Sequence, residues 1–192
     1  ITVTALNTID TYTGTSLTYV DSYTVSGLQN SDSVTAISYT FTGTSNSGTA
    51  ITNAARPISA GTYSITPVPT ISNSGYYESV TVTSGTLIIN RATRTLTLNT
   101  PASPLKYGST TSLSASPYDG SSEGTLTFST STSESCTITS GSALAIKSKG
   151  TCSFTGQVSR GSNYETATSA AVTTTLTLAD TVTVTAITPQ VY

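Results

Sequence analysis

The sequence contains no histidine, no tryptophan and no methionine in 192 residues, and it contains only two cysteines. Histidine is the commonest general base near neutral pH and the commonest metal ligand, so its absence removes the usual centres of catalysis and metal binding. Charged residues are also scarce, at 8% of the chain, and the net charge is −2. This composition excludes the basic surface that binds nucleic acid or anionic lipid. We therefore expect no enzyme activity, no metal, no cofactor and no nucleic-acid partner.

Long apolar runs are absent as well. No stretch approaches the roughly 20 apolar residues that span a bilayer, so we expect no membrane-spanning segment. The sequence also lacks a secretory signal peptide with a charged start and an apolar middle. If the protein is exported, we expect its signal to have been removed or to lie upstream.

Serine and threonine are abundant instead and make up roughly 40% of the chain. Threonine and valine favour strands, whereas the strong helix formers are sparse. In one segment Ile37, Tyr39 and Phe41 recur at period two, which predicts a strand with one buried face. Several short strands separated by turn residues indicate a sandwich or barrel, and we expect an all-β protein. The predicted strands are residues 1–6, 17–25, 34–42, 62–67, 77–82, 86–90, 95–99, 113–115, 125–129, 136–139, 144–146 and 172–178, with a polar loop at 43–48 and a tight hairpin turn at Ser84-Gly85.

The first half carries short motifs in a fixed order. They are Tyr12-Thr13-Gly14, Ser26-Gly27-Leu28 with Asp32, Ala60-Gly61-Thr62-Tyr63-Ser64-Ile65, Gly75-Tyr76-Tyr77, and Gly85-Thr86-Leu87-Ile88-Ile89 followed by Arg91-Ala92. Their order and spacing resemble the mostly-β MBG or YDG modules, which occur in tandem in large bacterial surface proteins. The sequence departs from that pattern at Thr13, where these modules often have Asp, and at Ser31, where Gly usually precedes the Asp. The resemblance covers nearly all of residues 1–92 and implies a packing module without catalytic residues.

The second half carries a different signature around its cysteines. Its parts are Cys136-Thr137-Ile138-Thr139, Leu144-Ala145-Ile146, Lys149-Gly150-Thr151-Cys152-Ser153-Phe154, and Gly161-Ser162-Asn163-Tyr164 followed by Ala167. This arrangement resembles bacterial immunoglobulin-like repeats over roughly residues 93–180. The two resemblances together imply two tandem immunoglobulin-like β-sandwich domains.

Three interpretations of Cys136 and Cys152 remain open from the residues alone. A metal site would need further ligands, and the sequence offers neither His nor a third Cys. A catalytic thiol would need a nearby base or cation, and none is evident. The third interpretation, a Cys136–Cys152 disulfide, requires an oxidising compartment. We predict the disulfide, and with it an extracellular location.

The end of the chain repeats its beginning. The segment Val182-Thr183-Val184-Thr185-Ala186-Ile187 matches residues 1–6 in type at every position, and Tyr192 falls within one residue of where Tyr12 would recur. A period of about 180 residues suits a unit of one or two whole domains. We interpret residues 1–92 and 93–180 as two modules and 181–192 as the first strand of a next repeat or a donor strand. The alternative is chance, because β-rich sequences reuse Thr/Val strands.

These observations predict a structural repeat unit of a large secreted or cell-surface, adhesin-like protein or extracellular filament, acting as a stalk or fibre. Its partners would be neighbouring copies of the same repeat. Two alternatives stay open. One is an adhesive module that binds a glycan or a surface receptor through exposed aromatic side chains, with Tyr76 and Tyr77 as candidates. The other is a pilus-like subunit that polymerises by strand addition through residues 182–187.

Overall fold

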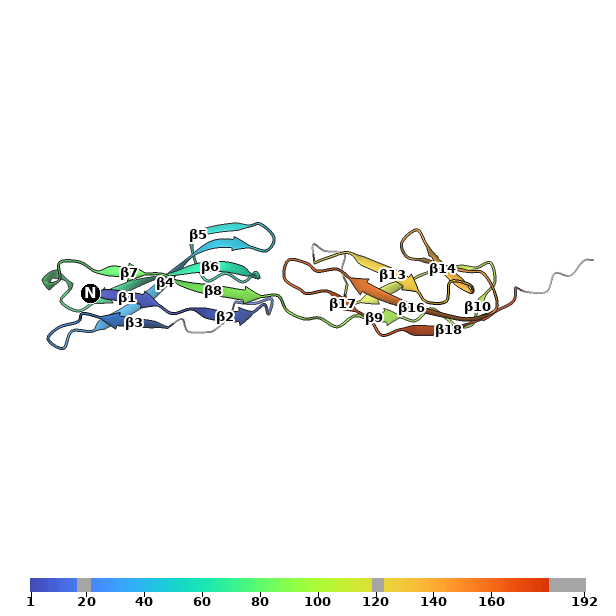
Figure 1. Ribbon diagram of the computed structural model, residues 1–192, viewed down its shortest axis with the longest axis horizontal. Coiled ribbons are helices and arrows are strands. Elements are labelled where there is room, and N and C mark those ends of the chain that lie inside the picture. Colours follow the sequence, from blue (N-terminus) through green and yellow to red (C-terminus); the bar gives the residue numbers. More distant parts are fainter. Residues whose placement is uncertain (17–21, 119–122, 180–192) are drawn as a thin grey trace, which may run out of the picture. The chain divides into compact units, whose positions relative to one another are not determined.

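The computed structural model describes residues 1–16, 22–118 and 123–179. Over these residues the protein is all-β, as the sequence predicts, and the single helical element is a 3-10 turn, η1 (Ser74–Tyr76). None of the helices in the described ranges has the length and apolar character needed to cross a membrane. The chain divides into two units (Figure 1). Unit 1 comprises Ile1–Arg94, Ser122–Gly124 and Ser159–Thr166, and unit 2 comprises Thr95–Ser121, Thr125–Val158 and Ala167–Tyr192.

Unit 1 forms two sheets among its described residues. The smaller has the order β3-β1-β7, with β1 in the middle (Figure 1), and the larger has the order β2-β8-β6-β4-β5. The strands are β1 (Thr2–Ala5), β2 (Thr8–Thr11), β3 (Tyr23–Ser26), β4 (Val34–Ser45), β5 (Ala50–Ala54), β6 (Gly61–Ile71), β7 (Thr81–Thr83) and β8 (Gly85–Asn90).

The longest strand pair in unit 1 is β4 with β6. They run antiparallel from the pair Val34–Ile71 to the pair Ser45–Gly61. Along β6 alternate side chains point inward, because successive residues of a strand face opposite sides of the sheet. Inward-facing side chains of β4, β6 and β8, with Ala5 of β1 and Ala60 just before β6, build the main core cluster of unit 1. The cluster consists of Ala5, Phe41, Ala60, Tyr63, Ile65, Leu87 and Ile89.

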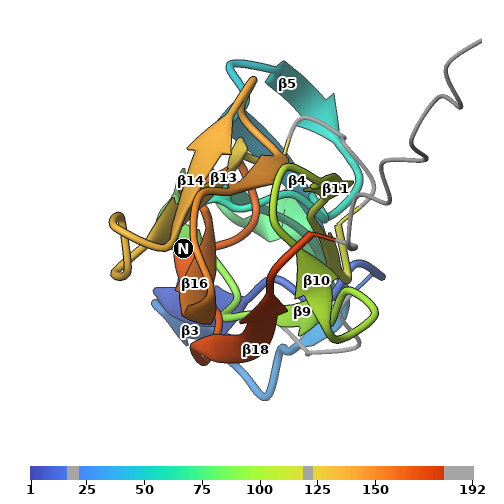
Figure 2. The ribbon, with the colours of Figure 1, turned by 90° about the vertical axis from the view of Figure 1, so that its right-hand side faces the viewer.

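Unit 2 forms three sheets among its described residues, with orders β10-β18-β16-β13, β11-β15-β14 and β12-β9, and β17 also pairs with β16. In the end-on view of Figure 2, β10 lies beside β18, in agreement with their pairing. The strands are β9 (Thr97–Asn99), β10 (Leu105–Lys106), β11 (Thr110–Ser112), β12 (Ser114–Ser116), β13 (Leu126–Thr130), β14 (Cys136–Thr139), β15 (Ala143–Ile146), β16 (Gly150–Val158), β17 (Ala167–Thr168) and β18 (Val172–Thr177).

The core of unit 2 alternates in the same way. Along β16, Cys152, Phe154 and Val158 are buried on one face of the strand. The complete cluster consists of Leu96, Leu98, Leu113, Ala115, Cys136, Leu144, Ile146, Cys152, Phe154, Val158, Ala167 and Leu176. Each unit therefore has a hydrophobic core of its own.

The predicted hairpin turn at Ser84-Gly85 is wrong. β7 pairs with β1, whereas β8 pairs with β2 and β6, so the chain passes here from one sheet to the other. A Cβ on Gly85 would lie 2.6 Å from the carbonyl oxygen of Ala5. The glycine therefore permits a close backbone approach between the sheets, and its role is steric.

The predicted polar loop at 43–48 is also partly wrong. β4 continues through Ser45, with a bulge between Phe41 and Gly43, and β5 follows the turn. β5 and β2 were not predicted. The serines and glycines of residues 43–48 are turn residues by composition, and pairing with β6 on one side and β5 on the other extends β4 this far.

Candidate functional sites

The predicted disulfide is present and links two different sheets of unit 2. Cys136 lies on β14 and Cys152 on β16, and their Cα atoms are 5.9 Å apart. Both side chains are completely buried in the core of the unit. The neighbouring hydroxyl of Thr130 lies 3.3 Å from the Cys136 sulfur and donates a hydrogen bond to the carbonyl oxygen of Ser153. The disulfide therefore joins two sheets within a packed interior, where it constrains the fold.

The second candidate site is the place that β1 occupies in the small sheet of unit 1. β1 pairs antiparallel with β3, from Thr2–Ser26 to Ala5–Tyr23, and parallel with β7, from Thr2–Thr81 to Thr4–Thr83. Both of its edges are thus hydrogen-bonded to neighbouring strands. Val3 is 0% exposed and Ala5 is 3% exposed, while the alternating Thr2 and Thr4 are partly exposed. The sheet therefore requires an alternating strand with a valine and a small residue pointing inward.

Backbone contacts mark both ends of this position. At one end a Cβ on Gly27 would lie 3.4 Å from the Cα atom of Ile1. At the other end Gly85 approaches the carbonyl oxygens of Ala5 and Leu6 so closely that a Cβ would lie within 2.7 Å of either oxygen. Residues 182–187, which carry the matching sequence, lie outside the described residues.

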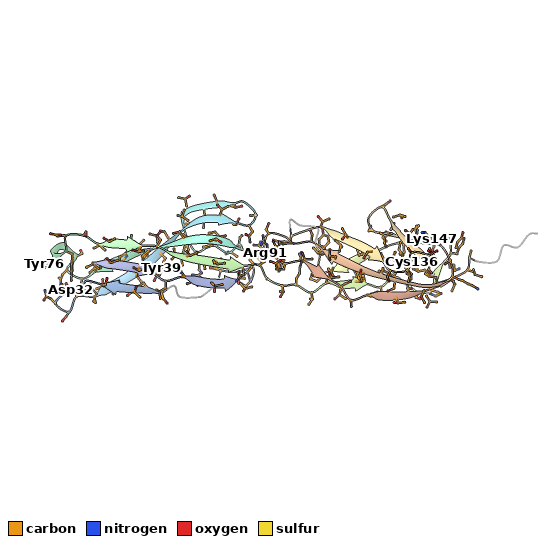
Figure 3. All side chains as sticks on the ribbon, in the orientation of Figure 1. Asp32, Tyr39, Tyr76, Arg91, Cys136 and Lys147 are labelled. Carbon is orange, nitrogen blue, oxygen red and sulfur yellow. A yellow bond between two sulfur atoms is a disulfide. The ribbon has the colours of Figure 1, made fainter. Side chains whose placement is uncertain are left out.

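The third candidate is a hydrogen-bonded cluster around Asp32, at the end of unit 1 that also carries Tyr76 (Figure 3). The Tyr77 hydroxyl donates to Asp32 Oδ2 at 2.6 Å, and Asn73 Nδ2 donates to Asp32 Oδ1 at 2.7 Å. The Ser72 hydroxyl also donates to Oδ1, and the backbone N–H of Gln29 donates to the Tyr77 hydroxyl. Asp32 thereby ties the loop after β3 to the segment around η1.

These hydrogen bonds shift two pKa values in opposite directions. The hydrogen bond from Tyr77, followed by that from Asn73, lowers the pKa of Asp32 because both stabilise the carboxylate. The same bond raises the pKa of Tyr77, because an ionised phenol could no longer donate to the carboxylate. The arrangement holds a carboxylate and a neutral phenol together and thereby joins two loops. We call this cluster of Asp32, Tyr77, Asn73 and Ser72 the Asp32 clasp.

The structure separates the two predicted aromatic candidates. Tyr76 is 89% exposed at the end of η1, whereas the Tyr77 side chain is partly buried and its hydroxyl is engaged with Asp32. The next most exposed aromatic side chain among the described residues is Tyr107, 53% exposed in unit 2. Tyr76 is therefore the side chain that an adhesive surface on unit 1 would present.

Two further acidic side chains of unit 1, Asp10 and Glu123, make local contacts. Asp10 pairs with Arg56 at 2.5 Å, and both side chains are largely buried, at 15% and 10% exposure. Glu123 accepts a hydrogen bond from Asn163 Nδ2 at 2.7 Å. Within the described ranges no three Cys, Asp or Glu side chains gather closely enough to hold a metal ion.

Unit 2 contains a shallow groove of about 750 Å³ beside β12, β13 and β14. Ala115, Leu126, Phe128 and Ile138 contribute apolar surface to it, and the described residues lining it include no Asp, Glu, Lys or Arg. Its polar side chains are hydroxyls, among them Tyr118, Thr125 and Thr127, and they lie beside the apolar surface.

A comparison of the chain with protein-family models found no match. A search of curated proteins found no matching relative either.

Proposed function

We propose that this chain is a structural repeat unit of a large extracellular protein, and that it serves as a load-bearing segment of a stalk or fibre. Its two units are two tandem immunoglobulin-like β-sandwiches, the first similar to MBG or YDG modules and the second to bacterial immunoglobulin-like repeats. The protein is secreted or displayed at the cell surface, its partners are neighbouring copies of the repeat, and it is not an enzyme.

The observation that carries this proposal is the parallel pairing of strands near the beginning and the end of each unit. In unit 1, β2 pairs parallel with β8 from Thr8–Leu87 to Thr11–Asn90. In unit 2, β10 pairs parallel with β18 at Leu105–Leu176 and Lys106–Thr177. β1 and β7 are parallel as well.

Parallel pairing determines how a unit responds to tension. When a chain is pulled from both ends, a strand near the beginning of a unit is drawn toward its N-terminal end and a strand near the end of the unit toward its C-terminal end. For parallel neighbours these directions are opposite along one axis, so the hydrogen bonds between them are loaded in shear and must break together. Forced unfolding depends on the unfolding rate, and a barrier shared by several bonds keeps that rate low.

Two further features support the proposal. The Cys136–Cys152 disulfide suits an oxidising, extracellular compartment and removes the intervening chain from the extensible length. The chain is rich in hydroxyl side chains and only 8% of its residues are charged, so it has little electrostatic attraction for nucleic acid or charged membranes.

Single-molecule stretching of the full chain tests the proposal. We expect two separate, abrupt unfolding events, one for each unit. The disulfide spans 16 residues, so reduction should lengthen one event by about 50 Å and leave the other unchanged. Gradual extension at low force without distinct events would contradict a load-bearing role.

The adhesive alternative is favoured by one observation, the 89% exposed Tyr76 beside the Asp32 clasp. A glycan array probed with the full chain and with Tyr76→Ala tests it. Binding that is lost in the variant would support the adhesive function, and the absence of any bound glycan would favour the stalk.

A further inference from the structure

We propose that the place of β1 in unit 1 is a strand-exchange site, and that residues 182–187 of a second copy of this chain are its alternative occupant. This inference rests on the proposed function as a repeat unit, and it names the surface through which copies of the repeat join.

The side chains that the site requires are present in the second segment. The paired part of β1 is Thr2-Val3-Thr4-Ala5, and residues 183–186 have the same sequence, Thr-Val-Thr-Ala. Val184 would take the fully buried position of Val3, and Ala186 would take the position of Ala5. A shift by one residue would turn threonines inward, so burial excludes that register.

The flanking positions tolerate the differences between the segments. Leu6 is 42% exposed, so Ile187 can replace it without entering the core. Val182 would replace Ile1, which approaches Gly27 through its backbone Cα and N atoms. Gly85 likewise approaches carbonyl oxygens of the strand in the site. These end contacts involve main-chain atoms, which every strand supplies.

Two other segments have sequences similar to that of β1, but both are already paired. Residues 33–36 read Ser-Val-Thr-Ala and enter β4, which pairs with β6. Residues 81–84 read Thr-Val-Thr-Ser, and the first three form β7, the neighbour of β1. Both belong to unit 1 itself, so neither is available to fill its β1 position.

The covalent attachment of β1 to unit 1 decides whether β1 or the segment of a second copy occupies the site. The chain's own β1 is tethered to the site and acts at an effective concentration in the millimolar range, so it excludes a dilute competitor. A second copy can enter only where β1 is missing or has been released. Strand exchange of this kind is a low-cost route to assembly because it replaces native contacts with equivalent ones.

Deleting residues 1–6 from the full chain opens the site and leaves residues 181–192 as the donor. We expect this variant to form concentration-dependent, head-to-tail oligomers in size-exclusion chromatography with light scattering, while the unaltered chain stays monomeric. Adding Val184→Ser, which places a hydroxyl at the buried position, should weaken assembly at least about tenfold. Thr185→Ser changes a partly exposed position and serves as the matched control. A monomeric, folded deletion variant would overturn the proposal.

A second experiment covers the case in which the deletion variant does not fold. A protease site beside the exposed Asn7 lets the chain fold intact before cleavage frees β1. An excess of labelled peptide with the sequence of residues 181–188 should then exchange into unit 1, as should a reference peptide of residues 1–7. Exchange of the reference peptide alone would overturn the proposal, and so would exchange of neither peptide. The stretching experiment uses the uncut chain and does not depend on peptide exchange. It therefore tests the proposed function independently of the strand-exchange site.

Discussion

The hydroxyl of Tyr77 lies 2.6 Å from Asp32 Oδ2 although the two residues are 45 positions apart in the chain. Their bond joins the loop after β3 to the segment that leads into β7, the two strands that flank β1. The left-handed backbone of Asn73, at φ 50°, brings its amide to the other oxygen of the same carboxylate. Asp32 therefore helps to fix the spacing of the strands between which β1 lies.

Removing this clasp should loosen unit 1. We expect Tyr77→Phe to lower the melting temperature of unit 1 in calorimetry, because the phenol loses the bond to Asp32 and the one it accepts from Gln29. Tyr76→Phe removes a hydroxyl from an 89% exposed side chain and is the matched control. Equal melting temperatures for the two variants would contradict a structural role of Tyr77.

The clasp should also respond to pH in two windows. The pKa of Asp32 is lowered in the folded state, so its contribution is present above the unfolded value of about 4 and is lost as the pH falls through the lower, folded value. The pKa of Tyr77 is raised, so its contribution is present below about 10 and is lost as the pH rises through the higher, folded value. Asp32→Asn should flatten the acid limb of the stability curve of unit 1. An unchanged acid limb in that variant would assign the acid sensitivity to other carboxyl groups.

A glycine at the crossing between the sheets of unit 1 should tolerate no side chain. Gly85→Ala would place a methyl group 2.6 Å from the Ala5 carbonyl oxygen, and backbone atoms cannot move aside as a flexible side chain can. We expect a loss of about 3 kcal/mol in unfolding free energy, as for severe overpacking. Gly75→Ala, at a position with nothing within 4 Å of the new Cβ, should change stability by less than about 0.5 kcal/mol. Denaturant titration of the two variants measures the difference.

The sequence predicts a structural element correctly where the signal is local, and Gly85 is a position where it is not. Alternation such as Ile37, Tyr39 and Phe41 identifies β4 because the period of two is a local property of the strand. The dipeptide Ser84-Gly85 is also a local signal, but it is compatible with both a tight turn and a crossing between sheets. Pairing of β7 with β1 decides between these two structures, and pairing is a property of the whole fold.

Contacts between side chains could likewise be predicted from the sequence only in part. The disulfide was predictable because the chain offers one possible pair of cysteines. The ion pair of Asp10 with Arg56 was not, because β2 lies at the edge of a five-stranded sheet in an order that the sequence does not reveal. Nothing in the spacing of the acidic residues pointed to Asp32 as the centre of a hydrogen-bonded cluster.

The ion pair of Asp10 with Arg56 should contribute much more than an exposed pair. Asp10→Asn would take the carboxylate from a guanidinium that is 10% exposed and also lies 5.8 Å from the centre of the Phe41 ring. We expect a loss of about 3 kcal/mol, the lower end for breaking a buried pair. Glu165→Gln disrupts the exposed pair with Arg160, at 41% and 61% exposure, and should cost less than about 1 kcal/mol. Similar losses in the two variants, measured by denaturant titration, would show that burial does not strengthen the first pair.

The disulfide gives unit 2 a stability that reduction should remove selectively. Closing a loop of 16 residues restricts the unfolded chain and stabilises the folded state by about 3 kcal/mol in the chain-entropy model. We therefore expect Cys136→Ala combined with Cys152→Ala to lower the unfolding free energy of unit 2 by about that amount, with some further loss because both sulfurs are packed in the core. Unit 1 contains neither cysteine and is the internal control, since its transition should stay in place. Comparing the oxidised chain, the reduced chain and the double variant separates the effect of the bond from that of the lost sulfur atoms. If the reduced and oxidised chains unfold at the same denaturant concentration, the bond does not stabilise the fold, and its part in limiting extension under load would have to be judged from the stretching experiment alone.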